Sequence, residues 1–244
     1  MTAQIVLVHG IRTSASMWRA QLRYLSERGV PAVAVDLPGH GTRMAERFTL
    51  EGAFDTIDGA VRDAARRGPV VLVGHSMGGL LCLEYAGART PPPIAGLVAA
   101  SCTSIPRGAG LTFYRVLARG FDRLPDRGMW LTQRMLTATL PEHTRSDFGA
   151  GGYAFDTQDL ALGLLSTLDI AAALPRIRVP LWFVNGQYDQ LRLNERLFTR
   201  LAPHGELLVV PKTSHLVSAM RPDVFNALLG LAVARIDAGD EAPT

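Results

Sequence analysis

Residues 70–81 read Val-Val-Leu-Val-Gly-His-Ser-Met-Gly-Gly-Leu-Leu. The first four are apolar and mostly β-branched, which is typical of a strand buried on both faces of a parallel sheet. The residues from Gly78 onward have the apolar composition of a buried helix. The five residues 74–78 must therefore turn a strand directly into a helix, with Ser76 at the tip of the turn.

This turn has the pattern Gly-x-Ser-x-Gly, which is that of a nucleophile elbow. Glycine suits positions 74 and 78 because strand and helix come so close together that side chains there would collide. Ser76 would lie at the helix N-terminus, where unpaired N–H groups and the helix dipole favour developing negative charge. Ser76 could instead only cap the helix, but the apolar strand before it and the apolar helix after it favour a nucleophile.

Further apolar runs predict five more strands, at residues 4–8, 30–37, 94–100, 180–185 and 206–211. Apolar residues at helical spacing predict helices between and after them, at residues 16–28, 50–67, 194–201 and 222–236. Strands that alternate with helices in this way are typical of the α/β class. We therefore predict a six-stranded parallel, doubly wound sheet.

One long segment, residues 102–169, interrupts this alternation. It contains helical patterns but no convincing strand, and glycines break it near residues 149–152. Phe113, Leu117 and Phe121 recur at spacings of four, which predicts a helix. An insertion after the fourth strand would lie over the carboxyl ends of the strands, where Ser76 is. We expect a core of residues 1–101 and 170–237, a helical cap of residues 102–169 and a frayed tail at 238–244.

Composition excludes several classes of protein. The chain has 244 residues, 48% of them hydrophobic, which suits one α/β domain rather than two of equal rank. No apolar run approaches the ~18 residues of a membrane span, and no basic stretch precedes the first strand, so we expect a soluble, cytoplasmic protein. Cys82 and Cys102 suit buried thiols in a reducing compartment. The net charge of +3 comes from scattered arginines, because Lys212 is the only lysine, and this gives no support to nucleic-acid binding.

A serine nucleophile needs a base to take its proton, and the chain has six histidines. His215 fits best, because it follows the last predicted strand at the edge of the sheet where the elbow also emerges. We expect His75 to point away from the Ser76 side chain. The remaining histidines lie in turns after strands or in polar segments beside helices: His9, His40, His143 and His204.

The base in turn needs an acid that fixes its tautomer. Asp189 follows the fifth predicted strand, at the same edge of the sheet, and Asp169 is the second candidate. The order Ser76, Asp189, His215 is the one expected for this architecture. An oxyanion hole would take one N–H donor from Met77, directly after the nucleophile, and a second from Ile11 in the turn after the first strand.

Five motifs point together to one family: His9-Gly10, residues 36–41 (Asp-Leu-Pro-Gly-His-Gly), residues 74–79, residues 186–189 and Ser214-His215. Over almost its whole length the chain resembles a serine-type α/β-hydrolase. The resemblance implies an α/β-hydrolase fold that cleaves small-molecule carboxylic esters through an acyl-enzyme, with no metal or organic cofactor. Because only three residues precede residue 4, we expect no N-terminal antiparallel hairpin. This start, together with residues 214–223, is similar to the compact plant-type methylesterases and hydroxynitrile lyases.

Other activities of this fold remain open. A thioesterase or a carbon-carbon hydrolase would use the same triad, a perhydrolase side activity would also fit, and some relatives are small-molecule receptors without catalysis. Compact hydroxynitrile lyases place a lysine beside the catalytic histidine, whereas this chain has Leu216 there, so we expect ester hydrolysis. Trp130, Phe148 and Tyr153 flank the glycine-rich break and are expected to line an apolar pocket for small to medium uncharged esters.

Overall fold

The computed structural model describes residues 2–108, 111–112, 115–116, 119–120 and 123–239. Six strands form one sheet in the order β2-β1-β3-β4-β5-β6, and every neighbouring pair is parallel. They are β1 (Gln4–Val8), β2 (Ala32–Val35), β3 (Val70–His75), β4 (Gly96–Ala100), β5 (Leu181–Gly186) and β6 (Gly205–Val210). The predicted six-stranded parallel sheet is confirmed.

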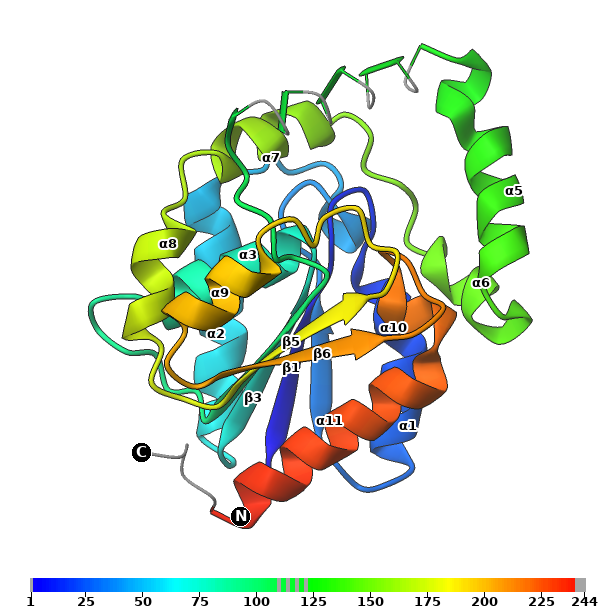
Figure 1. Ribbon diagram of the computed structural model, residues 1–244. Helices are drawn as coiled ribbons and strands as arrows, with labels where there is room; N and C mark the ends of the chain where they lie inside the picture. The colour runs from blue at the N-terminus through cyan, green and yellow to red at the C-terminus, as the bar shows by residue number, and fades with distance from the viewer. Residues whose placement is uncertain (1, 109–110, 113–114, 117–118, 121–122, 240–244) are drawn as a thin grey trace.

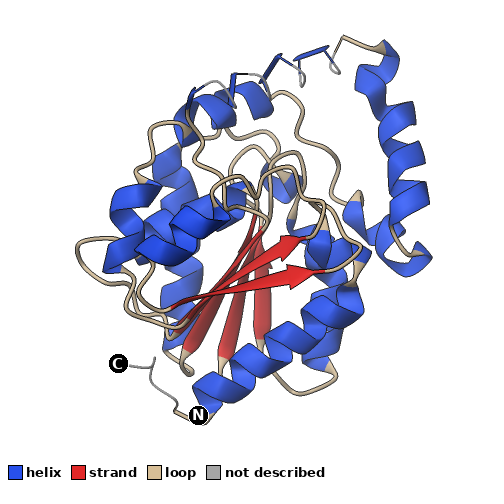
Figure 2. Ribbon diagram, viewed as in Figure 1, coloured by secondary structure: helices blue, strands red, loops and turns tan. Residues whose placement is uncertain are grey.

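Helices cover both faces of the sheet (Figure 2). One face carries α1 (Arg19–Ser26) and α11 (Pro222–Asp237), and the other carries α2 (Leu50–Ala65), α3 (Met77–Ala86) and α9 (Glu195–Leu201) (Figure 1). Side chains of β1 alternate between the two resulting cores: Ile5 and Leu7 pack in one, Val6 and Val8 in the other. This alternation follows from the two-residue period of a strand. It makes the sheet doubly wound, as its sequence predicts.

Several predicted elements differ from the structure by one or more residues at their ends, and two of these differences have a visible cause. The helix expected at residues 16–28 begins as a 3-10 turn, η1 (Ala15–Trp18), which the Ser14 side chain caps by accepting the N–H of Ser16. The strand expected at residues 30–37 is only β2 (Ala32–Val35). The N–H of Leu37 donates to Nε2 of His9 at 3.0 Å, so it takes no part in the strand ladder.

Between residues 102 and 169 the described regular structure is helical. It comprises η3 (Pro125–Gly128), α5 (Met129–Thr139), α6 (Glu142–Phe148) and α7 (Gln158–Leu165), beyond the carboxyl ends of the strands (Figure 1). The helical spacing of Phe113, Leu117 and Phe121, and residues 240–244 of the expected frayed tail, lie outside the described residues.

The described part of the chain also contains four short helices: η2 (Gly41–Arg43), α8 (Ile170–Ala173), η4 (Leu174–Arg176) and α10 (Val217–Met220). Of the helices in the described ranges, none has both the length and the apolar character needed to cross a membrane. The sheet also locates the candidate site. Because β1 lies between β2 and β3, the chain changes direction across the sheet at β1, and ligands of such sheets bind at the carboxyl ends of the strands near this point.

Candidate active site

Ser76 lies in a strained turn between β3 and α3. Its φ of 53° is unusual for a residue with a side chain. A Cβ atom on Gly74 would lie 2.5 Å from the carbonyl oxygen of Gly78, and one on Gly78 would lie 2.4 Å from that of His9. Only glycine fits at both positions, as the pattern Gly-x-Ser-x-Gly predicts. The close packing holds Ser76 at the tip of the turn.

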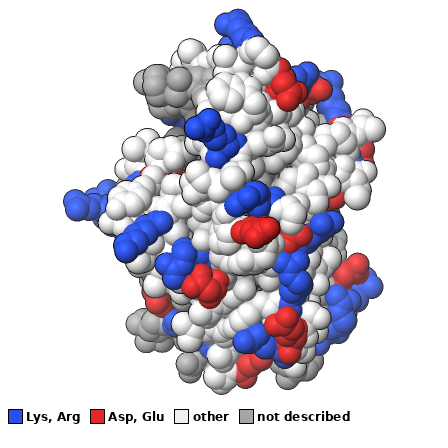
Figure 3. All heavy atoms as spheres, turned by 90° about the vertical axis from the view of Figure 1, so that its right-hand side faces the viewer, with Lys and Arg blue, Asp and Glu red and all other residues white. Residues whose placement is uncertain are grey.

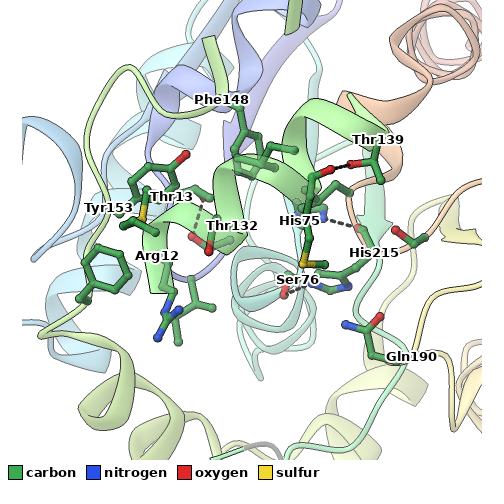
Figure 4. Close-up of a pocket in the computed structure, with 18 residues that line it drawn as sticks. Arg12, Thr13, His75, Ser76, Thr132, Thr139, Phe148, Tyr153, Gln190 and His215 are labelled. Carbon is green, nitrogen blue, oxygen red and sulfur yellow. Dashed lines mark hydrogen bonds between the residues drawn. The ribbon is translucent and has the colours of Figure 1, made fainter. Parts of the chain in front are cut away.

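Three side chains from three strand ends meet at this point, and Figure 4 shows two of them, Ser76 and His215. Nε2 of His215, after β6, lies 2.9 Å from Oγ of Ser76. Nδ1 of His215 lies 3.1 Å and 3.2 Å from the two carboxylate oxygens of Asp189, after β5. A carboxylate only accepts, so Nδ1 carries the proton and Nε2 is left to accept the Ser76 hydroxyl. This series of hydrogen bonds can pass a proton from the Ser76 hydroxyl to Nε2 of His215.

Asp189 is a buried acid whose surroundings keep it ionised. Burial raises its pKa, but the hydrogen bond and the charge of His215, with the N–H of Leu191 donated at 2.8 Å, bring the pKa below its ordinary value. A carboxylate in this state can orient the imidazole and stabilise its protonated form. The second candidate, Asp169, caps α8 by accepting the N–H of Ala172. The geometry therefore favours Asp189.

His75 makes a contact that the sequence did not reveal. Its Nε2–H donates to the backbone carbonyl of His215 at 2.8 Å, and its ring lines the same cavity as Ser76. Burial, together with the neighbouring His215, lowers the pKa of His75 to about 4, so its ring is neutral at pH 7. The histidine inside the elbow is visible in the sequence, but residues 75 and 215 are too far apart in the chain for any local pattern to predict their contact.

The two expected oxyanion donors, Ile11 and Met77, lie near Ser76. Met77 is the first residue of α3, so its N–H has no acceptor within the helix. No backbone carbonyl in the described part of the chain accepts a hydrogen bond from the N–H of Ile11 or Met77. The turn that carries Ile11 comes very near the nucleophile, because a Cβ atom on Gly10 would lie 3.3 Å from Cβ of Ser76.

Two cavities adjoin Ser76. The larger, of about 330 Å³, is lined by α5, by the loop of His215 and by two of the residues predicted from the sequence, Phe148 and Tyr153. The third, Trp130, is not part of its wall. Its side chain is 56% exposed on α5, whereas Met129 and Thr132 of the same helix line the cavity. The expectation for Trp130 is therefore wrong, because the orientation of α5 turns this residue outward.

The smaller cavity, of about 90 Å³, also adjoins Ser76 and is mainly apolar. Leu80 of α3 and Leu162 and Leu165 of α7 form much of its wall. Ile11 and Ser76 line both cavities. Among the described residues, no cluster of three or more His, Cys, Asp or Glu side chains could hold a metal ion. On the face in Figure 3, basic and acidic side chains are interspersed.

Comparison with known proteins agrees with this architecture. A family model described as "Alpha/beta hydrolase family" matches residues 5–228. Lipase LipV of Mycobacterium tuberculosis is 35% identical over 97 residues, which are 39% of this chain and only 36% of the lipase. The (E)-2-((N-methylformamido)methylene)succinate hydrolase of Acinetobacter baylyi is 26% identical over 91% of this chain and 87% of that protein. A solved thermophilic esterase from Thermogutta terrifontis superposes with a TM-score of 0.73 at 22% identity, over 96% of this chain and 90% of the esterase.

Proposed function

Because this chain belongs to the alpha/beta hydrolase family, we propose that it is a serine hydrolase that cleaves carboxylic esters of small to medium, mainly apolar substrates. The observation that carries the proposal is the continuous hydrogen-bonded chain from Ser76 through His215 to Asp189, with links of 2.9 Å and 3.1 Å. Both links are within reach for proton transfer and for orientation of the base.

In the first half of the reaction, Oγ of Ser76 attacks the ester carbonyl carbon while its proton passes to Nε2 of His215. The carbonyl π electrons move to the oxygen, and the N–H groups of Ile11 and Met77 stabilise the resulting oxyanion. Each such donor is typically worth ~3 kcal/mol in the transition state. The intermediate then collapses, the bond to the leaving oxygen breaks, and that oxygen takes the proton from His215. An alcohol leaves and an acyl-Ser76 ester remains.

The second half repeats these steps with water as the nucleophile. His215 takes a proton from the water as its oxygen attacks the acyl carbon, and returns a proton to Oγ of Ser76 when the acyl bond breaks. A carboxylic acid leaves and the free serine is restored. Asp189 stays ionised throughout and stabilises the protonated imidazole, in keeping with its lowered pKa.

We propose further that residues 102–169 act as a cap on a core of residues 1–101 and 170–237. The described helices of this segment contact the core through specific hydrogen bonds. The hydroxyl of Thr144 donates to the carbonyl of Ala219 at 2.9 Å, and that of Thr157 donates to the carbonyl of Gly39 at 3.2 Å. A cap held at these points would shield the acyl-enzyme from bulk water.

A fluorophosphonate probe tests the proposal, because it phosphonylates only an activated serine. We expect one adduct per chain, at Ser76, in the wild type and in Ser26→Ala, whose serine is exposed at the end of α1. Ser76→Ala should give no adduct and no hydrolysis of p-nitrophenyl butyrate. A wild type that forms no adduct would favour a small-molecule receptor of the same fold. Turnover of acyl thioesters with no turnover of oxygen esters would favour a thioesterase.

A further inference from the structure

Ser76 lies at the junction of two cavities that differ in size and in their neighbours. His215 and Ser214 line the larger one, of about 330 Å³. Met77 and Leu80 line the smaller one, of about 90 Å³, which His215 does not reach. The two arms of a substrate attacked by Ser76 could therefore lie in separate spaces.

The chemistry of the proposed reaction decides which arm enters which cavity. The tetrahedral carbon carries Oγ of Ser76, the oxyanion, the leaving oxygen and the acyl chain. The leaving oxygen must lie beside Nε2 of His215, because it takes its proton from there. We propose that the larger cavity holds the leaving alcohol and the smaller one the acyl chain. This assignment rests on the proposed function and defines the substrates as esters of short acyl chains with bulky alcohols.

The volumes set the expected sizes. The smaller cavity, of about 90 Å³, offers far less room than the larger one, of about 330 Å³. The smaller one therefore suits a short acyl chain, such as acetyl to butyryl, and the larger one an aryl or branched alcohol.

The walls of the two cavities also differ in polarity, and the difference supports the same assignment. Leucines of α3 and α7 face the smaller cavity, together with Ile105 and Leu191, so a saturated hydrocarbon chain fits there. The larger cavity adds hydroxyl and amide groups to its apolar wall, from Thr13, Thr132 and Gln190. An alcohol that carries an ether or hydroxyl group would find partners there.

Hydrogen bonds also hold part of the wall of the smaller cavity in place. The N–H of Ile105 donates to Oδ1 of Asn194 at 3.0 Å, and the N–H of Asn194 donates to the carbonyl of Thr103 at 2.9 Å. These bonds join the two loops that form one wall, while Leu165 of the opposite wall is part of the buried core. By contrast, α5 of the larger cavity stands apart from the sheet (Figure 1). We therefore expect strict selection of the acyl chain and tolerance of the alcohol.

Two isomeric esters test the assignment, because hexyl acetate and ethyl hexanoate have the same atoms and differ only in which arm is long. We expect kcat/KM, measured by acid release in a pH-stat, to be about tenfold or more higher for hexyl acetate. Equal rates, or faster hydrolysis of ethyl hexanoate, would overturn the assignment and leave the proposed function standing. Turnover of neither ester, together with no fluorophosphonate adduct at Ser76, would overturn both.

Variants of the two walls separate the cavities. Leu191→Ala should raise kcat/KM for ethyl hexanoate about tenfold and leave the preference among acetates unchanged. Leu162→Ala provides the same test if Leu191→Ala does not fold. Thr132→Phe, in the larger cavity, should lower turnover of hexyl acetate more than that of ethyl hexanoate. The matched control is Leu231→Ala, 67% exposed on α11, which should change neither rate. The assignment would be contradicted if Thr132→Phe hydrolysed ethyl hexanoate faster than the wild type does. It would also be contradicted if neither Leu191→Ala nor Leu162→Ala hydrolysed that ester faster.

Discussion

The Nε2–H of His75 donates to the backbone carbonyl oxygen of His215 across 2.8 Å. The residue before the proposed nucleophile thus holds the loop that carries the proposed base. Their rings lie 5.0 Å apart between centroids, and the His75 side chain is buried. Because the two residues come from different strand ends, this bond joins the elbow to the base loop in addition to the contact between Ser76 and the His215 ring.

Removal of the His75 ring should allow the loop that carries His215 to move. We expect His75→Ala to lower kcat by roughly tenfold with little change in KM, and to cost about 1–3 kcal/mol of unfolding free energy through the lost hydrogen bond. His75→Gln, whose amide can donate to the same carbonyl, should recover part of kcat. His143→Ala removes an exposed histidine and serves as the control. Loss of stability without loss of kcat would show that His75 is only structural.

The acid is assigned by a matched pair of variants. Asp189→Asn should lower kcat by ~10⁴, because an amide cannot stabilise the protonated imidazole and favours the wrong tautomer. Asp169→Asn should leave kcat unchanged, because asparagine caps a helix about as well as aspartate does. Steady-state hydrolysis of p-nitrophenyl butyrate measures both. A large loss in Asp169→Asn with little loss in Asp189→Asn would reverse the assignment.

Stability should fall in mild acid because three histidines, His9, His40 and His75, are buried and burial lowers the pKa of each. Burial lowers the pKa of His9 to about 3 and that of His75 to about 4, from an ordinary value of 6.5. Below pH 6.5 the unfolded chain binds protons that the folded chain excludes, so unfolding becomes easier as the pH falls toward 4. We expect a loss on the order of several kcal/mol between pH 7 and 4.5, measured by urea denaturation. A flat profile over this range would contradict the buried neutral state.

Glycine substitutions test the close approach of the first turn to the nucleophile. A Cβ atom on Gly10 would lie 2.9 Å from Nδ1 of His75, so Gly10→Ala must displace the turn or the ring. We expect kcat to fall by about ten- to a hundredfold. The control, Gly59→Ala, lies within α2 and meets nothing within 4 Å. It should keep full activity and raise the free energy of unfolding, measured by thermal denaturation, by about 0.5–1 kcal/mol. Equal kinetics for the two variants would disprove the steric explanation.

The lining of the larger cavity predicts a different result for Trp130 from the one expected from the sequence. Trp130→Ala should leave KM for p-nitrophenyl esters within about twofold of wild type, because an exposed side chain away from the site contributes little. Tyr153→Ala should raise KM, since Tyr153 lines the larger cavity and is half-buried. Initial rates over a range of ester concentrations give both values. A larger KM change for Trp130 would mean that α5 rotates when substrate binds.

The sequence alone was sufficient to predict the sheet and the meeting of Ser76, Asp189 and His215. Strand patterns are local, and the side chains that follow parallel strands share one edge of the sheet, so the order of motifs already implies their proximity. The steric need for glycine at positions 74 and 78 is also local, because strand and helix adjoin in the chain. The distances now agree with these predictions, and the catalytic roles depend on the variants described above.

The tertiary structure alone decided three other features: the bond from His75 to the base loop, the outward position of Trp130 and the two cavities at Ser76. Each depends on the direction in which a side chain points once distant segments have packed together. The spacing of apolar residues on α5 does not specify which face turns toward Ser76, because no strand next to it in the chain fixes its rotation. The division of the pocket into two unequal spaces likewise arises from the way α3, α5 and α7 pack around one serine, and no local sequence pattern spans all three helices.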